Sequence, residues 1–174
     1  MRPALALAAV GVAALLLRGA LAGAIPPALH PDLPLVVVVG LGLRRPGATG
    51  LLVAAGLGCV ADVLTGALLG HHAMLYVLAF AVTRIAGSQL DLRRPAPTAF
   101  LVAALSVAYG VGSVVLSRLF ADGVAWPAAG RLLGQAAVDG VIAPIVLPLL
   151  SRLVAALDED DRRAVPLAPR RREA

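Results

Sequence analysis

The sequence has no lysine, a single cysteine and very few aromatic residues, and each scarcity excludes a class of protein. All 15 basic residues are arginines, set in small clusters beside 10 acidic residues, which is not the continuous basic face of a nucleic-acid-binding protein. The lone cysteine, Cys59, lies in an apolar run, so neither a disulfide nor a cysteine-based metal site forms within one chain. With aromatic residues at 3%, the chain also lacks the side chains that usually line a pocket for a flat organic ligand.

Long hydrophilic segments and catalytic motifs are missing as well. Charged residues make up only 14% of the chain, against about 25% in soluble proteins. There is no glycine-rich phosphate loop, no Ser-His-Asp ordering and no paired carboxylate set of the kind that serves an aqueous active site. The sequence therefore predicts a protein that is not an enzyme and that has no cofactor, no metal ion, no nucleic-acid partner and no small-molecule substrate.

The chain is instead rich in apolar sequence. Hydrophobic residues make up 60% of its 174 positions, above the roughly 45 to 50% that is typical of soluble proteins. A membrane-spanning helix needs about 20 mostly apolar residues, and five segments meet that need: residues 3–25, 47–66, 70–91, 97–119 and 129–153. We therefore expect an all-α polytopic membrane protein, in contact with membrane lipid, in which residues 1–156 form a single transmembrane domain.

A further apolar segment, residues 31–45, is short. Its apolar part covers only about 16 Å as a helix, so its length also fits a re-entrant or interfacial segment. The arginines favour a crossing, because Lys and Arg accumulate in cytoplasmic loops. If the segment crosses, six helices place Arg2, the arginine pairs at 44–45 and 93–94, and the Arg-rich tail from Arg152 on the cytoplasmic side. We therefore predict six transmembrane helices, the second one short, with cytoplasmic N and C termini.

This topology also fixes the residues expected in the outer loops, which are His30, Asp32, His71, His72, Asp122 and Trp126. The adjacent histidines at 71–72 point in different directions on a helix and have no evident third ligand, so we expect no metal site there. The short second helix requires either local thinning of the bilayer or burial of that helix against longer neighbours.

Each end of the chain has its own pattern. A basic start, an apolar stretch and Ala-Leu-Ala before Gly23 fit a first transmembrane helix and also fit a cleavable signal peptide. Cleavage would leave every later helix oriented as before, so both alternatives stay open. Residues 157–174 are charged and contain proline, and we expect them to form a disordered cytoplasmic tail.

Three ionisable side chains fall inside the expected helices at one depth. At about 1.5 Å per residue, Arg18, Asp62 and Asp139 lie roughly 21 to 23 Å above the inner face. Ionisable groups in a membrane usually face the bundle interior and pair there, so we predict an ion-pair cluster in which Arg18 is a partner of Asp62. Gln135 lies one turn from Asp139 on the same helix face and belongs to this intramembrane polar cluster. The alternative is a proton or ion relay, which normally needs titratable groups across the whole membrane.

Small residues recur at every fourth position in the third expected helix and beyond it. In lipid, helices associate through close backbone packing, which small side chains at this spacing permit. We expect a helix-packing seam made of Gly50, Ala54, Gly58, Gly66 and Gly70. Two uses of this seam stay open: packing within the bundle, or docking of another membrane protein.

The order of these features resembles that of a known family. Residues 31–84 contain, in order, Pro31-Asp32 before a short apolar helix, the basic turn Arg44-Arg45 with Gly47 and Gly50, the Gly58-x-x-x-Asp62 step, and Gly66-x-x-x-Gly70 before a helix with Tyr76. This run resembles the MreD family of bacterial rod shape-determining membrane proteins, and the total length and six helices fit that family over nearly the whole chain. The chain departs from the family's usual composition in being rich in Ala, Gly and Arg and poor in aromatic residues.

The resemblance implies a non-enzymatic scaffold subunit of the cell-elongation machinery in the bacterial inner membrane. Members of the family associate with the MreC scaffold and, through it, with the MreB filament, the RodA glycosyltransferase and a transpeptidase, and they take part in regulating cell shape and peptidoglycan synthesis. The family is also similar in fold to the substrate-binding subunits of energy-coupling-factor transporters, which makes a vitamin-binding subunit the main alternative. A proton-coupled transporter, with Asp62 and Asp139 as carriers, is a third.

Overall fold

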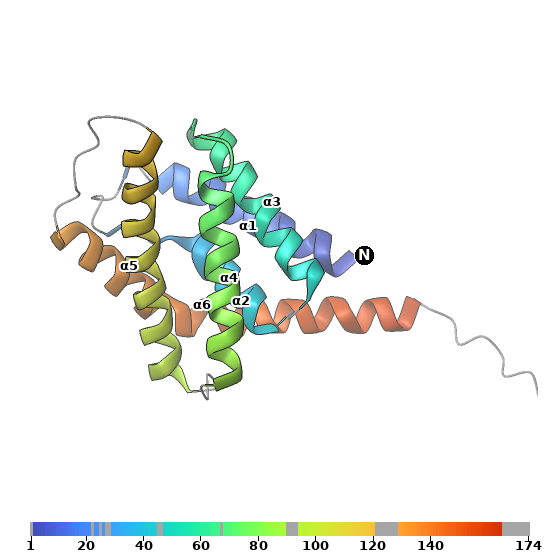
Figure 1. Cartoon of the computed structure of the whole chain (residues 1–174). Helices are drawn as coiled ribbons and strands as arrows, with labels where there is room; N and C mark the ends of the chain where they lie inside the picture. The colour runs from blue at the N-terminus through green and yellow to red at the C-terminus, as the bar shows by residue number, and fades with distance from the viewer. Residues whose placement is uncertain are drawn as a thin grey trace, which may run out of the picture.

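The computed structural model describes residues 2–21, 23–24, 26, 29–44, 47–66, 68–89, 94–120 and 129–164, which form six α-helices and no β-strand. The helices are α1 (Arg2–Leu21), α2 (Leu33–Arg44), α3 (Ala48–Thr65), α4 (His71–Gln89), α5 (Pro95–Phe120) and α6 (Ala129–Ala164). In Figure 1, α4 and α5 stand side by side, α3 runs obliquely beside α4, α1 runs beside α3, and α6 crosses the lower part of the bundle. Arg45, Arg93, Asp122 and Trp126, which entered the topology prediction, lie outside the described residues.

The all-α class is confirmed, and the helices begin and end close to the expected segments except at the end of α6. That helix continues to Ala164, whereas we expected a disordered tail from residue 157, so the expected disorder is wrong for residues 157–164. The sequence beyond 157 places acidic residues four positions before arginines, a spacing that favours helix. The remainder of the expected tail, from residue 165, lies outside the described residues.

Among the described residues, three segments are long and apolar enough to cross a membrane: Ala48–Thr65, Pro95–Phe120 and Ala129–Leu153. Two shorter apolar helices, Leu5–Leu21 and Leu33–Arg44, accompany them. The outer surfaces of these elements carry large apolar side chains, among them Leu52, Phe100 and Val141, each more than two thirds exposed. Helices whose inward and outward faces are both apolar are typical of proteins surrounded by lipid. This is therefore a membrane protein.

The short helix α2 is the centre of the bundle. It contacts all five other helices, and every residue from Pro34 to Gly42 is buried. A helix without a polar face, such as this valine-rich one, is stable when apolar neighbours surround it. Burial against longer helices, one of the two explanations offered for its short length, is therefore confirmed.

The first part of the helix-packing seam lies inside the bundle. Gly50, Ala54 and Gly58 are buried on α3. At Gly58, an added Cβ would collide with the backbone of Ala73 in α4, so the two helix backbones meet at this point. Packing within the bundle is thus confirmed for these three residues.

The last two residues of the predicted seam, Gly66 and Gly70, do not pack. Both are exposed, and both have positive φ angles, 65° and 96°, in the turn between α3 and α4. Gly66 ends α3 as a left-handed cap whose N–H donates to the carbonyl oxygen of Asp62, a common role for glycine at a helix end. Their assignment to the seam is wrong, because the four-residue spacing continues past the end of the helix.

Candidate functional site

Asp32 lies at the N-terminus of α2 and is fully buried, with 0% of its surface exposed. Its Oδ1 accepts a hydrogen bond of 3.3 Å from the N–H of Leu35, and its carbonyl oxygen accepts one of 3.1 Å from Val36. Asp32 therefore caps α2, as aspartate often does at the residue before a helix. Asp32 lies in the connection between α1 and α2, and its place in an outer loop stays a prediction.

The other carboxylate oxygen of Asp32 pairs with Arg18, near the end of α1. Arg18 Nη1 lies 2.9 Å from Asp32 Oδ2, and 33% of the Arg18 side chain is exposed. Arg18 therefore forms an ion pair inside the bundle, but with Asp32, so the predicted pairing with Asp62 is wrong. His30 strengthens the same junction, since its Nε2 lies 2.8 Å from the carbonyl oxygen of Leu21. These contacts fix the end of α1 to the start of α2.

Asp139 of α6 joins the pair from the other side. It is also fully buried, with 0% exposure. Its Oδ1 accepts a 2.6 Å hydrogen bond from the N–H of Asp32, and its Oδ2 accepts one of 2.6 Å from the Ser106 hydroxyl of α5. We name Arg18, Asp32, Ser106 and Asp139 the Arg18 cluster. It connects α1, α2, α5 and α6, and it confirms that Arg18 and Asp139 belong to one polar cluster.

Two tyrosines lie close by. Tyr76 of α4 and Tyr109 of α5 have stacked rings with centroids 5.5 Å apart. Both hydroxyl oxygens are buried, and the Tyr109 hydroxyl lies within reach of Arg18 and of the Tyr76 hydroxyl. The tyrosine pair therefore packs against the Arg18 cluster.

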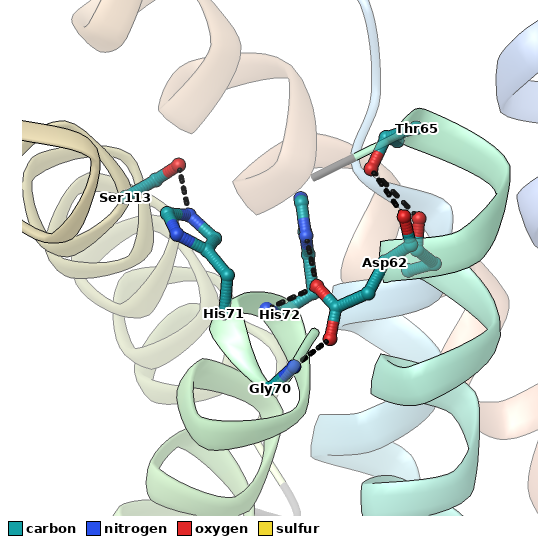
Figure 2. Close-up of polar contacts among 7 residues, drawn as sticks. Asp62, Thr65, Gly70, His71, His72 and Ser113 are labelled. Carbon is teal, nitrogen blue, oxygen red and sulfur yellow. Dashed lines mark hydrogen bonds and ion pairs between the residues drawn. The ribbon is translucent and has the colours of Figure 1, made fainter. Parts of the chain in front are cut away.

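Asp62 makes its contacts at the start of α4 (Figure 2). Its Oδ2 accepts a 2.8 Å hydrogen bond from the N–H of Gly70. Its Oδ1 accepts one of 2.7 Å from the N–H of His72 and lies 2.8 Å from Nδ1 of the same residue. The first N–H groups of a helix have no partner within it and carry partial positive charge, so a carboxylate fits this position. We name Asp62, Gly70 and His72 the α4 cap.

The α4 cap and the Arg18 cluster are neighbours. The His72 ring lies 6.2 Å, centroid to centroid, from the ring of Tyr109. His71 is buried, and its Nε2 lies 3.0 Å from Oγ of Ser113 in α5 (Figure 2). The single polar layer that the matched depths predicted is therefore divided into two sets of contacts, joined by aromatic rings.

Gln135 shares a cavity with Arg18. This cavity, of about 250 Å³, lies between α1, α5 and α6 and is also lined by Tyr109, Ser113 and Arg131. Gln135 is half-buried and Arg131 is exposed. The structure thus brings Gln135, Arg18 and Asp139 into one region, as predicted, and leaves Asp62 to the α4 cap.

Several polar residues in or beside the two sets were not predicted as partners: Asp32, His72, Ser106 and Tyr109. For Asp32 a signal existed, because an aspartate directly before an apolar helix is typical of a helix N-cap. For Ser106 and Tyr109 there was none, since a single polar residue in an apolar helix indicates a depth but not which neighbour its side chain meets.

Asp62→Ala should lower the free energy of unfolding by about 2 kcal/mol, because the first turn of α4 loses its capping carboxylate. The measurement is denaturant titration of the protein in mixed micelles. His72→Ala is the matched control, since it removes the ring contact but keeps both backbone hydrogen bonds to Asp62, and should cost about half as much. Equal losses for the two variants would contradict the capping role.

The buried carboxylates serve as hydrogen-bond acceptors that hold helices and helix ends in place. The carboxylates of Asp32, Asp62 and Asp139 all accept from backbone N–H groups. Among the described residues, no group of three or more His, Cys, Asp or Glu side chains is placed to hold a metal ion. In comparisons with known proteins, the chain matches no protein-family model, no curated protein and no solved structure.

Proposed function

We propose that this protein is a non-enzymatic scaffold subunit of the MreD type in the bacterial cell-elongation machinery. In this proposal six helices cross the inner membrane and both termini lie in the cytoplasm. The protein binds an MreC-like scaffold and, through it, MreB, RodA and a transpeptidase, and so takes part in regulating cell shape and peptidoglycan synthesis. Its own role is to hold a partner in position and not to carry out chemistry.

The central position of α2 supports a six-helix crossing. As a helix of 12 residues, α2 spans about 18 Å, less than the roughly 30 Å of the hydrocarbon core. A short helix exposed to lipid would leave its polar ends at the wrong depth. Because α2 touches every other helix, protein surrounds it along its length and such a crossing is favourable.

The polar groups inside the bundle also fit a scaffold. Asp32 and Asp139 connect helices in the Arg18 cluster, and Asp62 caps α4. A carrier aspartate would need to exchange its partners during transport, whereas these carboxylates are held by backbone donors from neighbouring elements. This arrangement supports a rigid body more than a proton-coupled transporter.

The observation that carries the proposal is an apolar groove between α1 and α3. It has a volume of about 430 Å³, and Ala8, Leu52, Gly56 and Val60 are among the residues that line it. The space above Gly56 is open, with no atom within 4 Å of an added Cβ. Small residues on an apolar, lipid-facing surface allow a second helix to approach closely. We propose that this groove receives a transmembrane helix of the MreC-like partner.

Gly56→Leu should reduce recovery of the partner about tenfold, which corresponds to about 1.4 kcal/mol of binding free energy. A Cβ added at Gly56 meets no atom within 4 Å, and Gly56 lines the groove, so the larger side chain takes up space that a partner helix would need. The measurement is affinity purification from native membranes with quantification of the co-purifying proteins by mass spectrometry. Gly19→Leu is the matched control: it lies in α1 with equally open space but outside the groove, and should leave recovery unaffected.

Two results would count against the proposal. Unchanged recovery of an MreC-like scaffold with Gly56→Leu would exclude the groove as its binding site. Recovery of an ATPase-bearing transporter complex by the wild-type protein, without any MreC-like scaffold, would favour the vitamin-transporter alternative.

A further inference from the structure

We propose that the cavity between α1, α5 and α6 is a binding site for a phosphate group, supplied either by the headgroup of a phospholipid or by a soluble phosphate ion. The cavity, of about 250 Å³, brings together donors from three helices: Arg18, Tyr109, Ser113, Arg131 and Gln135. The inference does not depend on the scaffold function proposed above, which concerns the groove between α1 and α3.

Two guanidinium groups line the cavity, and Arg131 supplies its net positive charge, because the charge of Arg18 is balanced by Asp32. Arg131 is exposed at the start of α6, and among the described residues no ion pair involves it. Arg18 uses Nη1 for Asp32, but a guanidinium has five N–H donors in a planar fork. Guanidinium groups match the geometry of phosphate oxygens and bind them with short, charge-assisted hydrogen bonds.

Neutral donors complete the lining of this cavity. Ser113 of α5 and Gln135 of α6 both line it. The Ser113 hydroxyl and the Gln135 amide can each donate to an oxygen of a ligand. Several donors from different helices suit a phosphate, which has more acceptor oxygens than a carboxylate.

The position of the cavity in the helices fits the polar boundary of a membrane. Arg131 is the third residue of α6 and Arg18 lies three residues before the end of α1, so both lie within about 5 Å of a helix end. The headgroup regions add roughly 5 to 8 Å on each side of the hydrocarbon core. An apolar groove of about 470 Å³, lined by His71, Leu116 and Phe120 among others, lies next to it, since His71 bonds to Ser113. An acyl chain fits such a groove, and water gives a soluble ion access to the same donors.

The test uses the full chain in detergent and the substitution Arg131→Gln. Phosphatidylglycerol and inorganic phosphate are titrated separately, with binding followed by native mass spectrometry for the lipid and by calorimetry for the ion. Dioleoylglycerol, which has acyl chains but no phosphate, is the lipid control. Arg152→Gln is the matched protein control, because it makes the same change on an exposed residue of α6 far from the cavity.

We expect at least one of the two phosphate probes to bind the wild-type protein and Arg152→Gln equally, and to bind Arg131→Gln about tenfold more weakly, as the loss of one charge-assisted contact implies. Binding of phosphatidylglycerol alone identifies a lipid headgroup as the source, and binding of inorganic phosphate identifies a soluble one. The proposal is overturned if neither probe binds, if dioleoylglycerol binds as tightly as phosphatidylglycerol, or if Arg131→Gln binds like the wild-type protein.

Discussion

Arg18→Ala should lower the free energy of unfolding by about 3 to 5 kcal/mol, measured by denaturant titration in mixed micelles. The substitution removes the cation that lies 2.9 Å from Asp32 Oδ2 and leaves that carboxylate buried. A desolvated charge without a partner is far less favourable than the intact pair, which is why removing one partner is costly. Arg84→Ala is the matched control: it truncates an exposed arginine of α4 and should change the free energy of unfolding by no more than about 0.5 kcal/mol.

A double-mutant cycle identifies the aspartate that Arg18 depends on. Asp32→Asn removes the buried charge but keeps a side-chain oxygen that can cap α2. In that background Arg18→Ala should cost about 2 kcal/mol less than in the wild-type protein, within the range of measured couplings between contacting residues. In an Asp62→Asn background the two effects should add to within about 0.5 kcal/mol. Coupling to Asp62 instead of Asp32 would contradict the ion pair.

The helices could be predicted from the sequence because the pattern that forms them is local. Each apolar run between polar or proline-containing turns became a helix, and α3 (Ala48–Thr65) lies inside the expected segment 47–66. The central position of α2 could be anticipated only as one of two possibilities. Its valine run has no polar face, which excludes a surface exposed to water but does not distinguish lipid from protein as its surroundings.

The depth of the polar side chains could be predicted from the sequence, but the residues that they contact could not. Helical rise alone put Arg18 and Asp139 at one level, and the structure places both in the Arg18 cluster. The choice between Asp32 and Asp62 depends on how α1 is rotated and where α2 begins, and neither is encoded in the spacing along one helix. The same limit applies to the seam, whose four-residue spacing extends from Gly58 to Gly66 although the helix ends between them.

Gly58→Ala is expected to destabilise the protein by about 3 kcal/mol, at the upper end of the cost of overpacking. The added Cβ would collide with the backbone of Ala73 and with the carbonyl carbon of His72, and backbone atoms move only if α3 and α4 separate. Such a separation also lengthens the hydrogen bonds that the Asp62 carboxylate accepts from the N–H groups at the start of α4, which are 2.7 and 2.8 Å long. One methyl group therefore disturbs both the packing and the α4 cap.

Gly56→Ala is the matched control and should have the opposite sign. It makes the same substitution on the same helix, two positions before Gly58. There an added Cβ meets no atom within 4 Å. Removing a flexible glycine from a helix interior should raise the free energy of unfolding by about 0.5 to 1 kcal/mol. Denaturant titration of both variants in the same micelles measures the difference. If both substitutions stabilise α3, the two helices are not in backbone contact at Gly58; if both destabilise it, the groove beside α1 is already filled.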